Sequence, residues 1–237
     1  TPKGGEIIYY ENDKNVKELI ENYENEDVTI RSYSHEKTIK KGKISYLVNQ
    51  LNKPIKINIF GKHNLQNIAG SKLVCEQLGI KEKYFYKAIR SYDLPENRLN
   101  IIYNKKFKVF RDFAHSPSKL SSTIEAVKSF HNKKLLVIYE LHSSSSFNKI
   151  FLKTYKDSMV YSDDSIIYLS DKLVKEKKYK KPSKSDMHNY FNSKKLIYVN
   201  ELKKLISILS RKKYDNYHKL FMSSGNFDGI NLKEIYK

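Results

Sequence analysis

The stretch FKVFRDFAHSPSKLSSTIEAVKSFHNKKLLVIYEL, residues 107–141, decides the fold class. Residues 107–113 are typical of a strand. Residues 117–130 have helical apolar spacing, and Pro117 suits the first turn of a helix. The run 135–141 is apolar apart from Glu140, as in a strand buried on both faces of a parallel sheet. A strand, a helix and a second strand in this order predict an α/β fold with a mostly parallel sheet.

Alternation of strands and helices continues on both sides of this stretch. Residues 99–103 form a further strand, joined to 107–113 by an Asn-Lys-Lys turn. Downstream we expect strands at 165–170, 196–199 and 219–223, and helices at 148–158, 201–211 and 231–236. The lysine-rich segment 172–184 is expected to be a solvated loop. This half of the chain therefore predicts one α/β domain.

The first ninety residues show a different pattern. We expect strands at 6–10, 28–33 and 54–60, a hairpin-like pair within 38–47, and helices at 15–22, 65–78 and 83–91. The helical pattern is broken at Pro95 in YDLPENR, because a proline disfavours helix in the residue before it. The predicted domains are 1–96 and 97–237.

Composition excludes several classes of protein. The net charge of +19, from 45 Lys plus Arg against 26 Asp plus Glu, would attract polyanions. Basic residues are spread along the chain and no nucleic-acid-binding signature occurs, so we favour compositional bias over a nucleic-acid partner.

No apolar run is long enough for a membrane span, and Cys75 alone cannot form a disulfide framework, which predicts a cytoplasmic protein. Neither GxSxG nor a Cys-His cluster occurs, so neither a serine hydrolase nor a metal site is predicted.

The segment GKHNLQNIAGSKLVCEQLGI, residues 61–80, carries the first candidate site. Asn64 and Asn67 lie one helical turn apart at a predicted helix start. Their amides offer donors and acceptors that can read the edge of a flat heterocycle such as adenine. Spacing alone favours the alternative that an Asn here caps the helix, with His63 as a surface histidine.

Three loops carry the second candidate site. Ligands of parallel sheets bind at the carboxyl ends of the strands, where 112–118, 142–147 and 223–229 are expected. The Asp112 carboxylate is either a hydrogen-bond acceptor for vicinal hydroxyls or a cap at the helix entry. Arg98 carries a planar guanidinium suited to phosphate, or forms a boundary salt bridge, for which Asp112 is one candidate partner.

These motifs together resemble the Mur ligase family, the ATP-dependent ligases that build and recycle the peptidoglycan precursor peptide. The resemblance rests on GKHN at 61–64 with Asn67, on Arg98, and on DFAHSP at 112–117, which is similar to the family's DFAHHP. ELHSSSSFN (140–148) and MSSGNFDGI (222–230) resemble the murein peptide ligase branch. The resemblance implies the end of a central P-loop-type ATPase domain followed by a Rossmann-like C-terminal domain.

The resemblance also implies roles for individual residues. The implied nucleotide-binding residues are His63, Asn64, Asn67, Arg98 and Asp112. Arg98 and His115 are the implied catalytic groups, although Ser116 replaces the family's second His and weakens that half of the motif. The implied substrate-binding residues are His142, Ser143, Ser144, Ser145 and Asn226. The alternative for the serines is a flexible loop.

The implied reaction uses ATP and Mg²⁺. The lactyl carboxylate of UDP-N-acetylmuramate becomes an acyl phosphate, and the amine of L-alanyl-γ-D-glutamyl-meso-diaminopimelate, the murein tripeptide, displaces phosphate. One alternative is addition of L-alanine to the same acceptor. The other is a non-catalytic, basic nucleotide- or nucleic-acid-binding protein on the same scaffold.

One family motif is missing from these 237 residues. No GxxxxGK[ST] phosphate loop occurs, and the family's Mg²⁺ ligands would also precede this region. We therefore expect a fragment, a processed product or one part of a split enzyme. Its expected partner is the missing N-terminal half of the ligase, without which it should not turn over.

Overall fold

A computed structural model describes residues 1–41, 44–49, 53–59, 61–93, 98–130, 132–193 and 195–236. The chain divides into two compact units, Thr1–Asp93 (unit 1) and Leu94–Lys237 (unit 2). The sequence predicted domains of 1–96 and 97–237; their equivalence to ligase domains stays a prediction.

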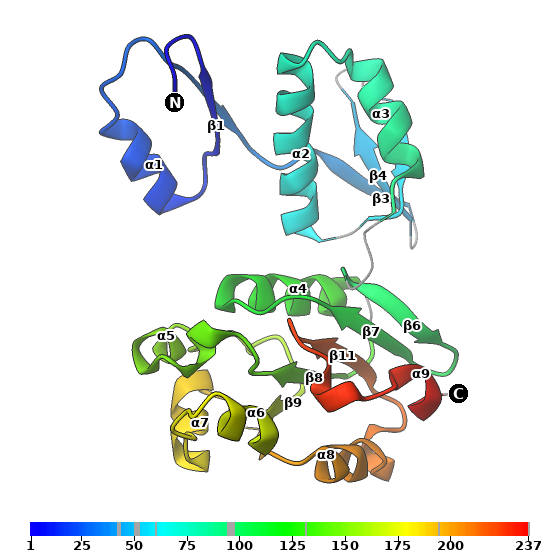
Figure 1. The fold of residues 1–237 in the computed structure, drawn as a ribbon. Coiled ribbons are helices and arrows are strands. Elements are labelled where there is room, and N and C mark those ends of the chain that lie inside the picture. Colours follow the sequence, from blue (N-terminus) through cyan, green and yellow to red (C-terminus); the bar gives the residue numbers. More distant parts are fainter. Residues whose placement is uncertain are drawn as a thin grey trace. The chain divides into compact units, whose positions relative to one another are not determined.

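Unit 2 is built on a six-stranded sheet in the order β10-β9-β8-β11-β7-β6 (Figure 1). The strands are β6 (Asn100–Asn104), β7 (Lys108–Asp112), β8 (Leu135–Glu140), β9 (Asp164–Tyr168), β10 (Leu196–Val199) and β11 (His218–Met222). Five run parallel, and β6 pairs antiparallel with β7 at the edge. The predicted α/β class with a mostly parallel sheet is confirmed.

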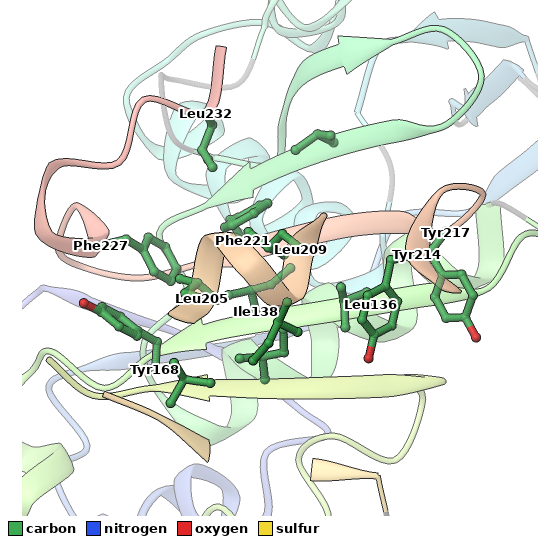
Figure 2. Packing of buried hydrophobic residues seen from close by; sticks show 14 residues of the cluster. Leu136, Ile138, Tyr168, Leu205, Leu209, Tyr214, Tyr217, Phe221, Phe227 and Leu232 are labelled. Atoms are coloured by element: carbon green, nitrogen blue, oxygen red, sulfur yellow. The ribbon is translucent and has the colours of Figure 1, made fainter. Parts of the chain in front are cut away.

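Helices cover both faces of this sheet. They are α4 (Pro117–Phe130), α5 (Lys149–Lys153), α6 (Asp171–Glu176), α7 (Lys184–Phe191), α8 (Leu202–Leu209) and α9 (Leu232–Ile235), with short 3₁₀ helices η1 (Ser144–Phe147), η2 (Lys212–Tyr214) and η3 (Phe227–Gly229). Alternate residues of β8 face opposite sides. Ile138 packs with Leu205 and Phe227 in the cluster of Figure 2, whereas the Tyr139 ring meets Tyr155 and Phe191 on the other face.

Unit 1 contains two small sheets. β1 (Glu6–Tyr10) and β2 (Thr29–Tyr33) pair in parallel, and β3 (Thr38–Lys41), β4 (Ile44–Val48) and β5 (Pro54–Ile57) form an antiparallel sheet. The helices are α1 (Lys14–Glu21), α2 (Lys62–Gln77) and α3 (Glu82–Ser91). At its centre the Lys72 ammonium lies 3.5 Å from Glu36, 3.3 Å from Glu82 and 3.3 Å from the Tyr86 hydroxyl. This cluster ties α2 to α3 and to the segment after β2.

Two expectations need correction. Part of the segment 172–184, predicted to be a solvated loop, is helical: α6 ends within it and α7 begins at Lys184. The helix expected at 148–158 is regular only over Lys149–Lys153, and it is preceded by η1. In both places a side-chain cap fixes the real helix start: Asn148 accepts from the amides of Ile150 and Phe151, and Ser183 with Asp186 forms a capping box.

Candidate functional site

The three predicted loops of unit 2 lie at one end of its sheet, where the carboxyl ends of the parallel strands meet. They follow β7, β8 and β11, which are adjacent and parallel, so their carboxyl ends meet. The expectation that 112–118, 142–147 and 223–229 share a sheet edge is therefore confirmed.

Asp112 ends β7 and its carboxylate is buried. One carboxylate oxygen accepts from the Leu99 amide at 2.8 Å and the other from the Ala114 amide at 2.7 Å. Leu99 has a left-handed φ of 53°, a strained conformation that this hydrogen bond stabilises. Asp112 thus holds the loop after β7 rather than capping α4, and its role toward a ribose stays a prediction.

An exposed row of side chains runs beside Asp112. The Arg98 guanidinium lies 5.7 Å from the centre of the Phe113 ring, and the Phe113 ring meets the His115 ring edge-on at 5.3 Å. No ion pair links Arg98 and Asp112, both of which are described, so a salt bridge between these two residues is wrong, while one between Arg98 and another boundary residue stays untested. The backbone carbonyl of His115 accepts from the hydroxyls of Tyr139 and Tyr155 at 2.9 and 2.8 Å. The side chains of Arg98, Phe113 and His115 thus lie in a row, and the two tyrosine hydroxyls hold the backbone at His115.

A buried polar network, not predicted from the sequence, joins the three loops. Arg111 donates to the Gly225 carbonyl at 2.5 Å. Glu140 accepts from the Ser223 hydroxyl and from the Phe227 amide, the latter at 3.0 Å. Burial lowers the pKa of Arg111, and the nearby Glu140 opposes this shift. The signal in the sequence was a charged residue inside each of two apolar strands.

The proposed substrate side is built on this network. The His142 ring packs against Gly225 so closely that a Cβ there would lie 2.4 Å from a ring carbon. Ser143 and Ser145 share a hydrogen bond of 3.1 Å, and Ser144 begins η1 and is exposed. These three residues thus have a defined local conformation, while both the flexible-loop alternative and their contact with substrate stay untested.

The loop after β11 adopts a strained conformation. Phe227 and Asp228 have successive left-handed φ values of 52° and 55°. The Tyr168 hydroxyl at the end of β9 donates to Asp228 at 2.6 Å, and burial together with this hydrogen bond raises the pKa of Tyr168. The Asn226 side-chain oxygen accepts a hydrogen bond from the Gly229 amide at 3.2 Å, so this oxygen stabilises the turn.

The remaining predicted residues lie in unit 1 at the start of α2. Gly61, with φ of 95°, is the N-cap, and no side chain caps the helix, so the capping alternative for Asn64 and Asn67 is wrong. Asn64 is buried and Asn67 is exposed, while His63 is half-buried. The Asn67 residue is thus more accessible to a ligand than Asn64.

Sequence comparison identifies proteins that are similar to this chain. The chain is 24% identical over 196 residues to UDP-N-acetylmuramate–L-alanine ligase of Fusobacterium nucleatum, covering 78% of the chain and 41% of that enzyme. It is 27% identical over 193 residues to the ligase of that name from Vesicomyosocius okutanii, covering 78% and 40%. The chain is therefore similar in sequence to Mur ligases over 78% of its length. It spans about 40% of the length of these curated relatives.

Solved structures of Mur ligases have the same fold. A murein peptide ligase from Psychrobacter arcticus matches with a TM-score of 0.66 at 18% identity, covering 94% of the chain and 49% of that structure. A MurF ligase from Acinetobacter baumannii matches with a TM-score of 0.68 at 16% identity, covering 94% and 49%. No protein-family profile matches the chain.

The described part of the chain carries neither a candidate membrane span nor a candidate metal cluster. No described helix is both long and apolar enough to cross a membrane. No group of three His, Cys, Asp or Glu side chains among the described residues could hold a metal ion.

Proposed function

We propose that this chain supplies the nucleotide-contacting and amine-substrate parts of an ATP-dependent ligase that acts on UDP-N-acetylmuramate. The observation that carries the proposal is the meeting of three motif-bearing loops at the carboxyl ends of parallel strands, in a chain similar to Mur ligases. In this proposal the lactyl carboxylate is phosphorylated by ATP and then attacked by an amine.

The residues fit distinct parts of this reaction. Arg98, exposed beside Phe113, would contact a phosphate, and Asn67 would contact the adenine edge. His115 and Arg98 would stabilise charge at the reacting centre. Mg²⁺ would neutralise phosphate charge when bound, and its ligands are expected in the missing N-terminal half of the ligase.

The amine substrate distinguishes two forms of the proposal. We favour the murein tripeptide, because 140–148 and 222–230 resemble the murein peptide ligase branch. The names of the curated relatives favour L-alanine instead. A ligase assay on the complete gene product, with the tripeptide and L-alanine as competing amines, decides between them. Formation of the L-alanine product alone would exclude the tripeptide.

Nucleotide binding tests the shared part of the proposal. Replacing Arg98 by Ala in the complete gene product should weaken an ATP analogue about tenfold, because one charge-assisted hydrogen bond is lost. Lys119→Ala, an exposed change on α4, is the matched control. Asp112 is a poorer probe, since its loss would also release Leu99. Unchanged affinity in both Arg98→Ala and Asn67→Ala would refute the nucleotide site.

A further inference from the structure

A basic segment lies at the same sheet edge as the three loops. We define it as residues 172–184, which contain seven lysines and one acidic residue, Glu176. It follows β9, which pairs in parallel with β8, so it leaves the sheet beside the loop that follows β8. None of the motifs discussed above includes it.

Aromatic stacking fixes the basic segment beside the serine loop. The ring of Phe147, at the end of η1, stacks on the ring of Tyr179 with centroids 3.8 Å apart and planes 12° from parallel. Lys181 pairs with Asp171 at 2.6 Å across the base of the segment. The segment is therefore attached at its centre to the loop that carries Ser143, Ser144 and Ser145, rather than projecting freely.

Most of the lysine charge there is uncompensated. Lys175, Lys177 and Lys178 are exposed and form no ion pair with any residue that the structure describes. Clustered like charges oppose folding, and they create a positive potential in the adjoining site. Serine hydroxyls can donate hydrogen bonds to carboxylates, and ammonium groups attract them.

We propose that the basic segment forms the outer part of the amine-substrate site and selects a peptide with several carboxylates over a neutral free amino acid. The inference rests on the proposed function and specifies its substrate class. The serines would contact the peptide near the reacting amine, and the lysines would attract its distal carboxylates. Phe147 and Tyr179 act as positioning residues.

Peptide binding to the complete gene product tests this inference separately from turnover. The probes are the murein tripeptide, the same peptide with its carboxylates amidated, and L-alanine, each titrated by calorimetry. Changing Lys175, Lys177 and Lys178 together to Gln should weaken tripeptide binding about tenfold, because three exposed charge pairs are lost. The amidated peptide and L-alanine should bind as before. Tyr179→Ala should weaken the tripeptide similarly, and the dependence of its binding on salt should fall.

The matched control removes equal charge elsewhere. Lys105, Lys106 and Lys212 are exposed but lie near the opposite ends of the strands, so their change to Gln should leave tripeptide binding unchanged. Equal losses in both triple variants, or no loss in either, would overturn the inference. Tighter, lysine-dependent binding of a single-stranded oligonucleotide that competes with the peptide would also overturn it. Lysine-dependent peptide binding without any ligation product would instead refute the proposed function and leave the selectivity standing.

Discussion

The two units bury charged side chains in different surroundings. In unit 1, Lys72 lies between two carboxylates, Glu36 and Glu82. In unit 2, Lys219 of β11 donates to the carbonyls of Tyr214 and Tyr217, with its ammonium 3.7 Å from the centre of the Phe107 ring. Neutral carbonyls and rings compensate a charge less than carboxylates do.

The difference shows in the proton affinities. Burial acts to lower the pKa of Lys72, but Glu36 and the contacts with Tyr86 and Glu82 outweigh it and raise the pKa. Burial lowers the pKa of Lys219 to about 8, with only partial opposition from Asp215. Two lysines of similar burial should therefore give their units opposite dependences on alkaline pH.

The largest effect is expected in the buried network of unit 2. Glu140→Ala removes the acceptor for the Ser223 hydroxyl and the Phe227 amide, and it removes one of the two carboxylates, Glu140 and Asp112, whose charges favour the Arg111 cation. Unit 2 should lose about 3–5 kcal/mol of unfolding free energy, the usual cost of breaking a buried charge pair. Urea unfolding followed by amide exchange, which resolves the two units, measures it. A loss shared equally by unit 1, or one matched by the exposed Glu201→Ala, would contradict the assignment.

A pH series on Lys219→Met tests the depressed proton affinity. Between pH 8 and the ordinary lysine pKa of 10.5, the unfolded chain binds more protons than the folded one. The wild type should therefore gain up to about 3 kcal/mol relative to the variant as pH rises through that window. The exposed Lys204→Met is the control. A difference in stability that stays constant with pH would show that Lys219 titrates normally.

A corresponding change in unit 1 should have the opposite sign. Lys72→Met leaves Glu36 and Glu82 partly buried without their cation, which should cost unit 1 about 2 kcal/mol at neutral pH. Because the folded pKa of Lys72 is raised, its contribution is complete below pH 10.5 and is lost as pH rises through the folded pKa. Thermal unfolding at pH 7 and at pH 11 measures both. If unit 1 of the wild type gained stability on alkalinisation relative to Lys72→Met, the pairing would be wrong.

The smallest effect concerns the strained turn after β11. Tyr168→Phe removes the 2.6 Å hydrogen bond to Asp228 and should cost about 1.5 kcal/mol, as expected for a bond to a charged group. Asp228 should then leave its left-handed conformation more often, which faster exchange of the Gly229 amide would report. Tyr161→Phe, an exposed change, should have no effect. An unchanged exchange rate at Gly229 would show that Asp228 is held by other contacts.

Sequence patterns predicted regular elements well where burial sets the pattern. The apolar run 135–139 of β8 and the spacing along α4 depend on one dominant interaction each, the packing of a core face. The lysine-rich segment 172–184 was misjudged because its helices depend on capping by Ser170 and Ser183 and on the stack of Phe147 on Tyr179. Neither the caps, which join residues three positions apart, nor the stack between distant residues changes the periodicity of the sequence.

The site was predictable in position but not in its connections. The rule that ligands bind at strand carboxyl ends located the three loops, because it needs only strand order and direction. The link from Arg111 to Gly225 joins residues 114 positions apart, and no local pattern indicates it. The position of Asp112 at the end of a strand was predictable, whereas the two backbone amides that donate to its carboxylate were not.

The carbonyl of His115, held by two tyrosine hydroxyls, has a thermodynamic consequence for any ligand at this edge. The peptide plane is already oriented when the chain folds, so its conformational entropy is lost before a ligand arrives. A ligand then has to order only the imidazole about its side-chain torsions. Association there should accordingly carry a small entropic penalty and should not require the backbone to rearrange.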